Sequence, residues 1–364
     1  MGAVSSLKKK KKSPGMSGAY KHSKVIGLRW NLSTILMIIF AVVLFVFIFN
    51  KWLGVYPKLL LYSLMSIIIF LMCFDNYIIS KILTAPDTTY NLELSNVDWK
   101  QFQYTGWGGD VLPAHFLEAK VKSDTLIFFL HGWSSSPGNI ESRMLHAHEH
   151  GVHVLTTDLR GHKLSVDLKH DWTFLKMLAD VEYLLEQFEK EVDRLGIKNL
   201  IFYGHSMGGF LSLRLSSHSS SWWGEKLTSV ILESPMVSFP MIMNSRHPGI
   251  LRLLLPLTRQ ILRREYQRIH PDLSLKYIDS EIPRWGIPEL PLLVLQSSDD
   301  IRLGSRHYEL ISKHLPKDSV AHVIESLEHT ARLDSNKRRA LFSDFLYSNY
   351  NLVRDQNLHA GEEK

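Results

Sequence analysis

Two long apolar runs fill much of the N-terminal quarter of the chain. They cover residues 30–49 and 59–74, and neither contains a charged residue. A helix needs about 20 residues, with a range of roughly 17–25, to cross the hydrocarbon core of a bilayer. The first run meets this length, whereas the second must extend towards Ile79. We therefore expect two transmembrane helices over residues 30–83, in preference to two buried core helices.

The basic residues around these runs predict their orientation. The segment before the first run is rich in lysine, above all at residues 8–12, whereas the connection between the runs holds only Lys51 and Lys58. Since basic flanks stay in the cytoplasm, two crossings would leave the rest of the chain cytoplasmic. If the second run lay in the interface instead of crossing, the large domain would occupy the other face.

Residues 1–29 form a polar, basic segment that we expect to be disordered. Gly2 and Ser6 match the pattern for N-myristoylation, and the neighbouring lysines would supply the second, electrostatic signal for membrane binding. The lysines have a simpler alternative role, which is to orient the helices without any lipid.

Beyond a linker at residues 84–94, short β-branched and aromatic runs alternate with amphipathic segments. Strands separated by helices pair in parallel with right-handed crossovers, so the expected class is α/β, with a mostly parallel central sheet and helices on both faces. We expect this domain over residues 95–350, a helical cap insertion over 239–290 and a polar tail over 351–364. Strands are predicted at residues 125–130, 152–157, 199–203, 228–232, 292–296 and 321–324, and helices at 140–150 and 174–195.

Composition narrows the range of functions. The chain has 45% hydrophobic and 21% charged residues, which is typical of a folded protein. Much of its net charge of +6 comes from the lysine tail, so nothing favours nucleic-acid binding. Cys73 is the single cysteine, which excludes a disulfide within the chain.

A short motif carries the candidate chemistry. Gly204-His205-Ser206-Met207-Gly208 lies between a predicted buried strand and a predicted helix. In a G-x-S-x-G corner of this kind the Ser adopts a strained conformation that lifts its hydroxyl out of the turn, and the glycines let strand and helix approach closely. The helix N-terminus directs backbone N–H groups at the same point.

The motifs GHSMGG and HGWSSS make the chain resemble the α/β-hydrolase superfamily, and within it the branch of monoacylglycerol lipases, lysophospholipases and serine aminopeptidases. The resemblance covers roughly residues 95–350. It implies the α/β-hydrolase fold with a helical cap, and a nucleophile, acid and base in that chain order. It says little about the substrate.

The resemblance assigns candidate catalytic roles. Ser206 is the expected nucleophile, and His329, in the loop after the strand at 321–324, is the expected general base. Asp300 follows the preceding strand and would orient the imidazole and stabilise its charged form. Asp299, beside it, and Glu233, at the end of the strand at 228–232, are the alternative acids.

The resemblance also implies an oxyanion hole. Its two backbone donors would be the N–H groups of Met207 and Trp133, and the Trp133 side chain would line the acyl pocket. His131 is expected to brace the turn before Trp133, and His205 to support or line the site. In the loop DLRGHKLS, Lys163 replaces the glycine usual in the family, which puts the shape of this loop in question.

We expect no metal and no cofactor. His146 and His150 have the i, i+4 spacing of helical metal ligands, but no third ligand is evident and Glu149 does not fit the metalloprotease pattern.

The cap insertion contains a basic amphipathic segment. It can be a lid helix packed over the core with solvated arginines, or a lid lying on anionic lipid, and the two are compatible. Its apolar side comprises Leu251, Leu254, Leu255, Leu257, Ile261 and Leu262, and its arginines are Arg252, Arg259, Arg263, Arg264 and Arg268.

Taken together, these features predict a membrane-anchored serine hydrolase that cleaves an ester or thioester. Its partners would be the bilayer and an acyl or lipid substrate. The lipid part depends on the anchor and the apolar cap, and hydrolysis of small soluble esters or peptides remains an alternative. A different class of function is a non-catalytic interaction module that keeps the fold.

Overall fold

The computed structural model describes residues 32–49, 54–82, 93–95, 98–168, 172–217, 222–245, 249–269, 280–325, 327–329, 334–350 and 352. The basic tail and the N-myristoylation pattern lie outside the described residues. The chain forms two compact units, which we describe separately. One is an α/β unit drawn from residues 85–246 and 276–364, and the other is a helical unit drawn from residues 22–84 and 247–275.

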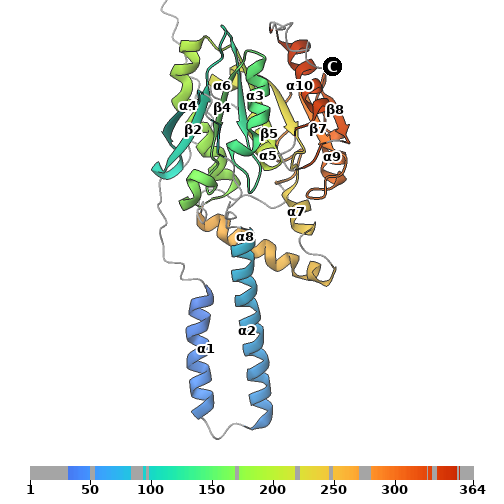
Figure 1. Cartoon of the computed structure of the whole chain (residues 1–364). Helices are drawn as coiled ribbons and strands as arrows, with labels where there is room; N and C mark the ends of the chain where they lie inside the picture. The colour runs from blue at the N-terminus through green and yellow to red at the C-terminus, as the bar shows by residue number, and fades with distance from the viewer. Residues whose placement is uncertain are drawn as a thin grey trace, which may run out of the picture. The chain divides into compact units, whose positions relative to one another are not determined.

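An eight-stranded sheet forms the centre of the α/β unit (Figure 1). Its strand order is β1-β2-β4-β3-β5-β6-β7-β8. The first two strands are antiparallel to their neighbours, and all later pairs are parallel. The predicted mostly parallel sheet is therefore confirmed. The strands are β1 (Lys100–Thr105), β2 (Val111–Leu117), β3 (Thr125–Leu130), β4 (His153–Thr157), β5 (Asn199–His205), β6 (Leu227–Glu233), β7 (Leu292–Ser297) and β8 (Val320–Ile324).

Helices cover both faces of this sheet. Helices α3 (Glu141–Glu149) and α10 (Asn336–Asn349) pack on one face, where Phe129 and Tyr203 point into the core. Helices α4 (Phe174–Leu195), α5 (Met207–Ser217) and α6 (Trp222–Lys226) contact strands of the sheet on the other face. Among the described residues of the unit, the other helical elements are η1 (Trp107–Gly109), η2 (Pro137–Ile140), η3 (Lys163–Leu168), α7 (Phe239–Ser245) and α9 (Ser305–Ser312).

Local sequence signals define the longest helix of the unit. The hydroxyl of Thr173 accepts a hydrogen bond from the N–H of Lys176, which satisfies one of the free donors at the start of α4. Gly196 ends the helix in the left-handed conformation, with φ 67°, which glycine adopts without steric cost. These caps explain why the predicted bounds of this helix agree with the structure.

The helical unit contains both apolar runs. They form α1 (Leu32–Phe49) and α2 (Val55–Ile82), which contact each other, with the Phe47 and Tyr62 ring centroids 5.6 Å apart. Two elements from the predicted cap belong to the same unit, η4 (Gly249–Leu254) and α8 (Leu255–Ile269).

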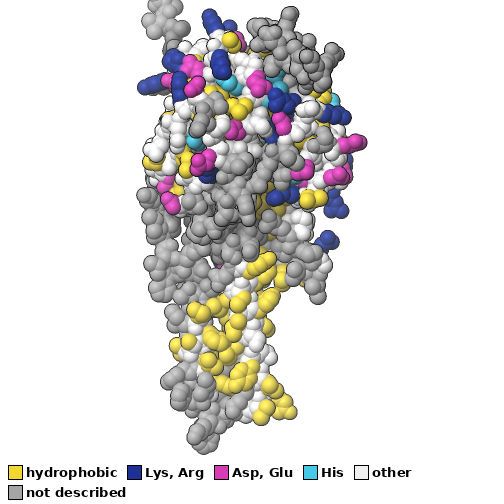
Figure 2. Space-filling model, in the orientation of Figure 1, with side chains coloured by type: hydrophobic (Ala, Val, Ile, Leu, Met, Phe, Trp, Pro, Cys, Tyr) yellow, Lys and Arg dark blue, Asp and Glu magenta, His cyan; other side chains and the backbone are white. Residues whose placement is uncertain are grey.

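The prediction of two membrane-spanning helices is not supported in full. Among the described residues, one stretch is long and apolar enough to cross a bilayer, Val55–Asp75 within α2. The first run, which is the better candidate by its uncharged length, forms a helix of 18 residues. The second run continues as a helix through Asp75 and beyond, which gives α2 its 28 residues. Hydrophobic side chains dominate the visible face of α2 (Figure 2).

The packing of α5 against the sheet requires glycine at two positions. A Cβ on Gly208 would overlap the carbonyl oxygen of Leu130, at the end of β3. A Cβ on Gly204 would lie 2.5 Å from the Cα of Gly209. Because backbone atoms cannot move aside as a flexible side chain can, these glycines set how closely α5 approaches the strands.

We predict that Gly208→Ala lowers the free energy of unfolding by about 3 kcal/mol or prevents folding, since it overpacks backbone against backbone. The control is Gly109→Ala. Gly109 has φ 81°, and a Cβ added there would meet no atom within 4 Å, so only the left-handed conformation opposes alanine, at about 1 kcal/mol. Thermal unfolding of the two variants measures the difference, and equal losses would contradict the steric argument.

Candidate active site

Ser206 lies in the sharp turn between β5 and α5. Its φ of 51° is in the left-handed region, which is unfavourable for a residue with a side chain. Backbone hydrogen bonds hold it there, because the Ser206 N–H donates to the Glu233 carbonyl at 3.0 Å and the Ser206 carbonyl accepts from the Met236 N–H at 3.0 Å. The turn is thus tied to β6 and the loop after it, and the Ser206 backbone has the strained conformation that the motif predicts.

Three side chains that are distant in the sequence meet at this turn. The Nε2 of His329 lies 3.1 Å from the Ser206 hydroxyl oxygen, and its Nδ1 lies 2.8 Å from Oδ2 of Asp300. A carboxylate accepts a hydrogen bond, so Nδ1 carries the proton and Nε2 is free to accept from the serine hydroxyl. All three residues are buried, and Ser206 is 9% exposed.

Asp300 is held by more than the histidine. Its Oδ1 accepts from the backbone N–H groups of Arg302 and Leu303, at 3.0 and 2.8 Å, and its Oδ2 also accepts from the side-chain amide of Gln296 at 3.1 Å. Burial opposes ionisation, but His329 and these donors outweigh it and lower the pKa of the Asp300 carboxyl. Its neighbour Asp299 is exposed.

Glu233, the second alternative acid, has different partners. Its carboxylate accepts from Arg143 at 2.8 Å and from the Tyr203 hydroxyl, and it lies 3.8 Å from Arg338. Burial alone would raise the pKa of this carboxyl, but Arg143 and Arg338 lower it far below its usual range. Glu233 therefore stays ionised inside the protein, where it joins α3, β5 and α10 behind the serine turn.

The expected oxyanion donors belong to two adjacent backbone segments. Met207 is the first residue of α5 and follows Ser206 directly. Trp133 follows Gly132, where a Cβ would lie only 3.1 Å from the Ser206 Cβ, so this turn passes beside the hydroxyl. The half-buried Trp133 side chain packs against Trp172, with ring centroids 4.6 Å apart.

Two buried histidines brace these segments. His131 Nδ1 donates to the Gly132 carbonyl, and its Nε2 accepts from the Leu159 N–H at 3.1 Å. His205 Nε2 donates to the His329 carbonyl at 2.8 Å, and burial lowers the pKa of His205 to about 4. His205 is therefore neutral near pH 7 and fixes the backbone of His329. The structure gives both histidines the supporting positions expected of them.

Lys163 shows how the DLRGHKLS loop accommodates its missing glycine. Lys163 has φ 37°, so it keeps the left-handed conformation that glycine favours. The loop remains in place beside the site, where the His162 ring centroid lies 5.2 Å from that of Trp133.

Sequence reasoning did not identify the ion pairs that anchor this region. The guanidinium of Arg160, in the same loop, donates to Asp180 of α4 at 2.7 Å and to Asp110 at 2.8 Å. An arginine directly after a buried strand, at the edge where the site forms, was the available signal. Arg143 and Gln296 were also missed. The partner of Arg143, Glu233, lies 90 residues away in the sequence, whereas Gln296 donates to Asp300 only four residues further on, a local contact that was overlooked.

The two histidines considered as metal ligands are engaged elsewhere. The Nε2 atoms of His146 and His150 lie 3.1 and 2.8 Å from the same hydroxyl, that of Ser343 in α10. Among the described residues no group of three or more His, Cys, Asp or Glu side chains could hold a metal ion.

Comparison with known proteins finds similarity in the α/β unit. Residues 121–282 match the family described as serine aminopeptidase, S33. A segment of 83 residues is 30% identical to a non-heme haloperoxidase of Rhodococcus erythropolis and covers 23% of this chain and 28% of that protein. The curated relative is therefore matched over little more than a quarter of its length.

Solved structures show the same fold at low identity. An esterase of Pyrococcus furiosus superposes with a TM-score of 0.51 at 17% identity, over 70% of this chain and 97% of that one. An acylaminoacyl peptidase of Pyrococcus horikoshii gives 0.50 at 15% identity, over 71% of this chain and 42% of that one. The α/β unit therefore has the α/β-hydrolase fold, and residues 121–282, a little under half of the chain, are similar to the serine aminopeptidase family.

We predict that Lys163→Gly is more stable than Lys163→Ala by about 1 kcal/mol, because only alanine has a Cβ that opposes the left-handed conformation. Both variants remove the lysine side chain, so its other interactions cancel in the comparison. Chemical denaturation of the two variants measures the difference. Equal stability, or a more stable alanine variant, would show that residue 163 does not need the glycine-like conformation.

Proposed function

We propose that this protein is a membrane-attached serine hydrolase that cleaves an ester or thioester of an acyl or lipid compound. The observation that carries the proposal is the hydrogen-bonded series from Ser206 through His329 to Asp300. A serine hydroxyl is a weak nucleophile at neutral pH and needs an adjacent base, which the Nε2 of His329 supplies in this arrangement.

In the first half-reaction the Ser206 oxygen attacks the substrate carbonyl while His329 Nε2 takes the hydroxyl proton. The negative charge that develops on the carbonyl oxygen is stabilised by the backbone N–H groups of Met207 and Trp133. Asp300 stabilises the imidazolium and keeps the proton on Nδ1 without accepting it. His329 then gives its Nε2 proton to the departing alcohol or thiol, and the acyl group stays on Ser206.

In the second half-reaction, water replaces the leaving group. His329 accepts a proton from this water, whose oxygen attacks the acyl carbonyl, and then returns the proton to the Ser206 oxygen as the carboxylic acid departs. The His205 hydrogen bond to the His329 carbonyl supports both steps, because it keeps the imidazole in place while its charge changes.

Two features favour an acyl or lipid substrate. Trp133, beside the nucleophile, packs against Trp172 and gives the site an aromatic wall. Ile301, next to Asp300, is 94% exposed and offers an apolar surface close to the triad. An acyl chain entering from an apolar phase would meet both.

Membrane attachment is supported by α2. Only 6% of the stretch Val55–Asp75 is buried, so its apolar surface lacks the cover that the core helix of a water-soluble protein would have. We propose that α2 crosses the bilayer, that α1 accompanies it, and that the basic N-terminus and the α/β unit both lie on the cytoplasmic side.

The two neighbouring aspartates provide a matched test. We predict that Asp300→Asn lowers kcat on acyl esters by about 10³–10⁴-fold, since the His329 tautomer and its charge are no longer supported. Asp299→Asn, a change of the same chemistry at an exposed position, should leave kcat within about twofold. Assays over acyl esters, thioesters and lysolipids of several chain lengths measure this effect and the substrate preference together.

Comparable losses in both variants would refute the role of Asp300. A folded wild-type protein that hydrolyses none of these compounds would favour the non-catalytic interaction module.

A further inference from the structure

Helices α8 and α2 of the helical unit are joined by an ion pair. An Nη2 atom of Arg264 lies 2.7 and 3.0 Å from the two carboxylate oxygens of Asp75. Asp75 is buried, with 6% of its surface exposed. The Arg264 side chain is 38% exposed, so the pair is shielded from water on the Asp75 side, and its two hydrogen bonds join α8 to α2 at this point.

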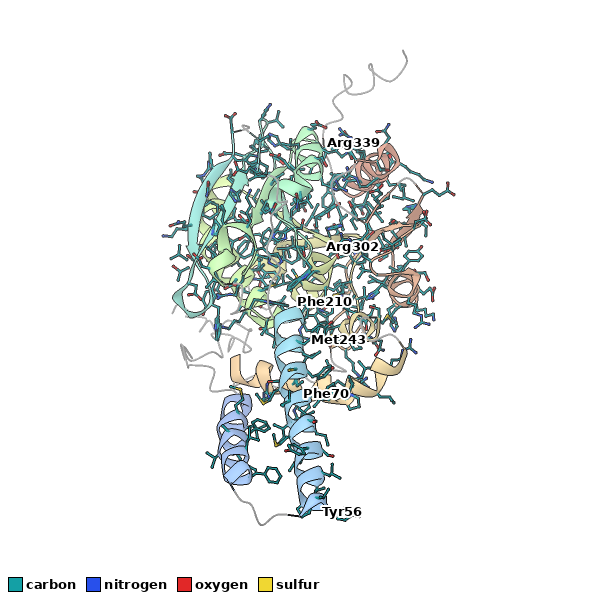
Figure 3. The ribbon with its side chains drawn as sticks, turned by 60° about the horizontal axis from the view of Figure 1, so that its bottom comes forward. Tyr56, Phe70, Phe210, Met243, Arg302 and Arg339 are labelled. Atoms are coloured by element: carbon teal, nitrogen blue, oxygen red, sulfur yellow. The ribbon has the colours of Figure 1, made fainter. Side chains whose placement is uncertain are left out.

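The ion pair lies at the end of the apolar part of α2. Asp75 is the last residue of the stretch that could cross a bilayer. Figures 1 and 3 both show α8 running across α2 instead of alongside it, and Tyr56 and Phe70 mark the apolar stretch in Figure 3. The large exposed side chains before Asp75 on α2 are Val55, Tyr56, Leu59, Leu60, Tyr62, Leu64, Ile67, Ile69, Phe70 and Leu71.

The exposed surface of α8 and of the adjoining η4 is basic. Thr258, Ile261 and Leu262 of α8 are buried, whereas Gln260 and Arg263 are exposed. Arg252, in the adjoining η4, is exposed as well. Glu265 is the single acidic residue among residues 249–269, so the sequence of this segment has a strong positive charge.

We propose that α8 lies in the headgroup layer of an anionic membrane, where Arg252 and Arg263 bind lipid phosphates and the Asp75–Arg264 pair sets the depth of the helix. The proposal rests on the membrane attachment proposed above. If the apolar stretch of α2 fills the hydrocarbon core, its end at Asp75 lies where the headgroups begin. Arginines on a helix fixed at that level are within about 10 Å, one Debye length, of the phosphates.

The observations favour lipid over the other polyanions that arginines bind. Ile261 and Leu262 of α8 are already buried, so the helix offers mainly polar contacts, while Leu253 of the adjoining η4 is an exposed apolar side chain that can enter the headgroup layer beside Arg252. The exposed apolar surface of α2 continues up to the ion pair with α8, which is an arrangement that suits a bilayer with charged headgroups and has no counterpart in a nucleic acid.

A fluorophore on Gln260 tests this position. The full chain carries Gln260→Cys together with Cys73→Ser, so that the label has one attachment site, and is reconstituted in vesicles of phosphatidylcholine and phosphatidylglycerol. Either lipid carries a nitroxide quencher on an acyl carbon close to the headgroup. When the two labelled lipids are compared at equal mole fraction, we expect nitroxide-labelled phosphatidylglycerol to quench the fluorophore at least twofold more than nitroxide-labelled phosphatidylcholine.

Variants separate the two parts of the proposal. Arg252→Gln with Arg263→Gln should abolish the preference for phosphatidylglycerol, whereas Lys122→Gln with Lys313→Gln, the matched loss of two exposed charges in the α/β unit, should retain it. Arg264→Gln should reduce quenching by both lipids, because α8 is then no longer held at the level of the headgroups by the ion pair with Asp75.

Equal quenching by the two lipids in the parent chain, or an undiminished preference in the arginine variant, would overturn the proposal. Flotation of the chain with the vesicles after an alkaline wash is measured first. A chain that floats without a lipid preference refutes the role of α8 alone, whereas a chain that does not float refutes the membrane attachment. Hydrolysis of a soluble ester, assayed in detergent, tests the proposed hydrolase activity separately, because it requires neither membrane attachment nor the lipid contact of α8.

Discussion

The site depends on one steric constraint, which is the contact between the start of α5 and the end of β3. The absence of a side chain at Gly208 lets the helix begin against the carbonyl oxygen of Leu130. This approach places Met207, the first residue of α5, and the turn at Gly132 beside Ser206. The strained Ser206 backbone persists because β6 and its following loop bind it from both sides.

A buried charge network supports this arrangement from behind. The backbone carbonyl of Glu233 accepts from the Ser206 N–H. Its side-chain carboxylate accepts from Arg143 and Tyr203. Leaving one member of such a network without its partner is costly, so the charges hold the strands and helices in one relative position. The polar groups on either side of Ser206 thus have separate roles, since Asp300 faces the imidazole while Glu233 fixes the turn.

Much of the α/β unit could be predicted from the sequence, because its parallel strands are buried on both faces and appear as short apolar runs. The strand 125–130 and the helix 174–195 agree with the structure to the residue. The antiparallel strands β1 and β2 were not located. β1 is polar and mostly exposed, and in β2 Pro113 and His115 interrupt the apolar run although most of the strand is buried. The extension of the second run towards Ile79 agrees with α2, whereas the expectation of two spans does not, because among the described residues only α2 contains a stretch long and apolar enough to cross a bilayer. The candidate site residues predicted from the sequence each follow a strand or a motif, whereas Arg143 and Arg160 act through contacts that only the folded chain brings together.

The central claim is that Ser206 is a nucleophile activated by His329, and covalent labelling tests it most directly. A fluorophosphonate should modify the wild-type chain once, at Ser206, as identified by mass spectrometry of the digested adduct. Ser206→Ala should remain unlabelled, and His329→Ala should be labelled at least 100-fold more slowly. Undiminished labelling of folded Ser206→Ala, or no reaction of the folded wild-type chain, would contradict the account.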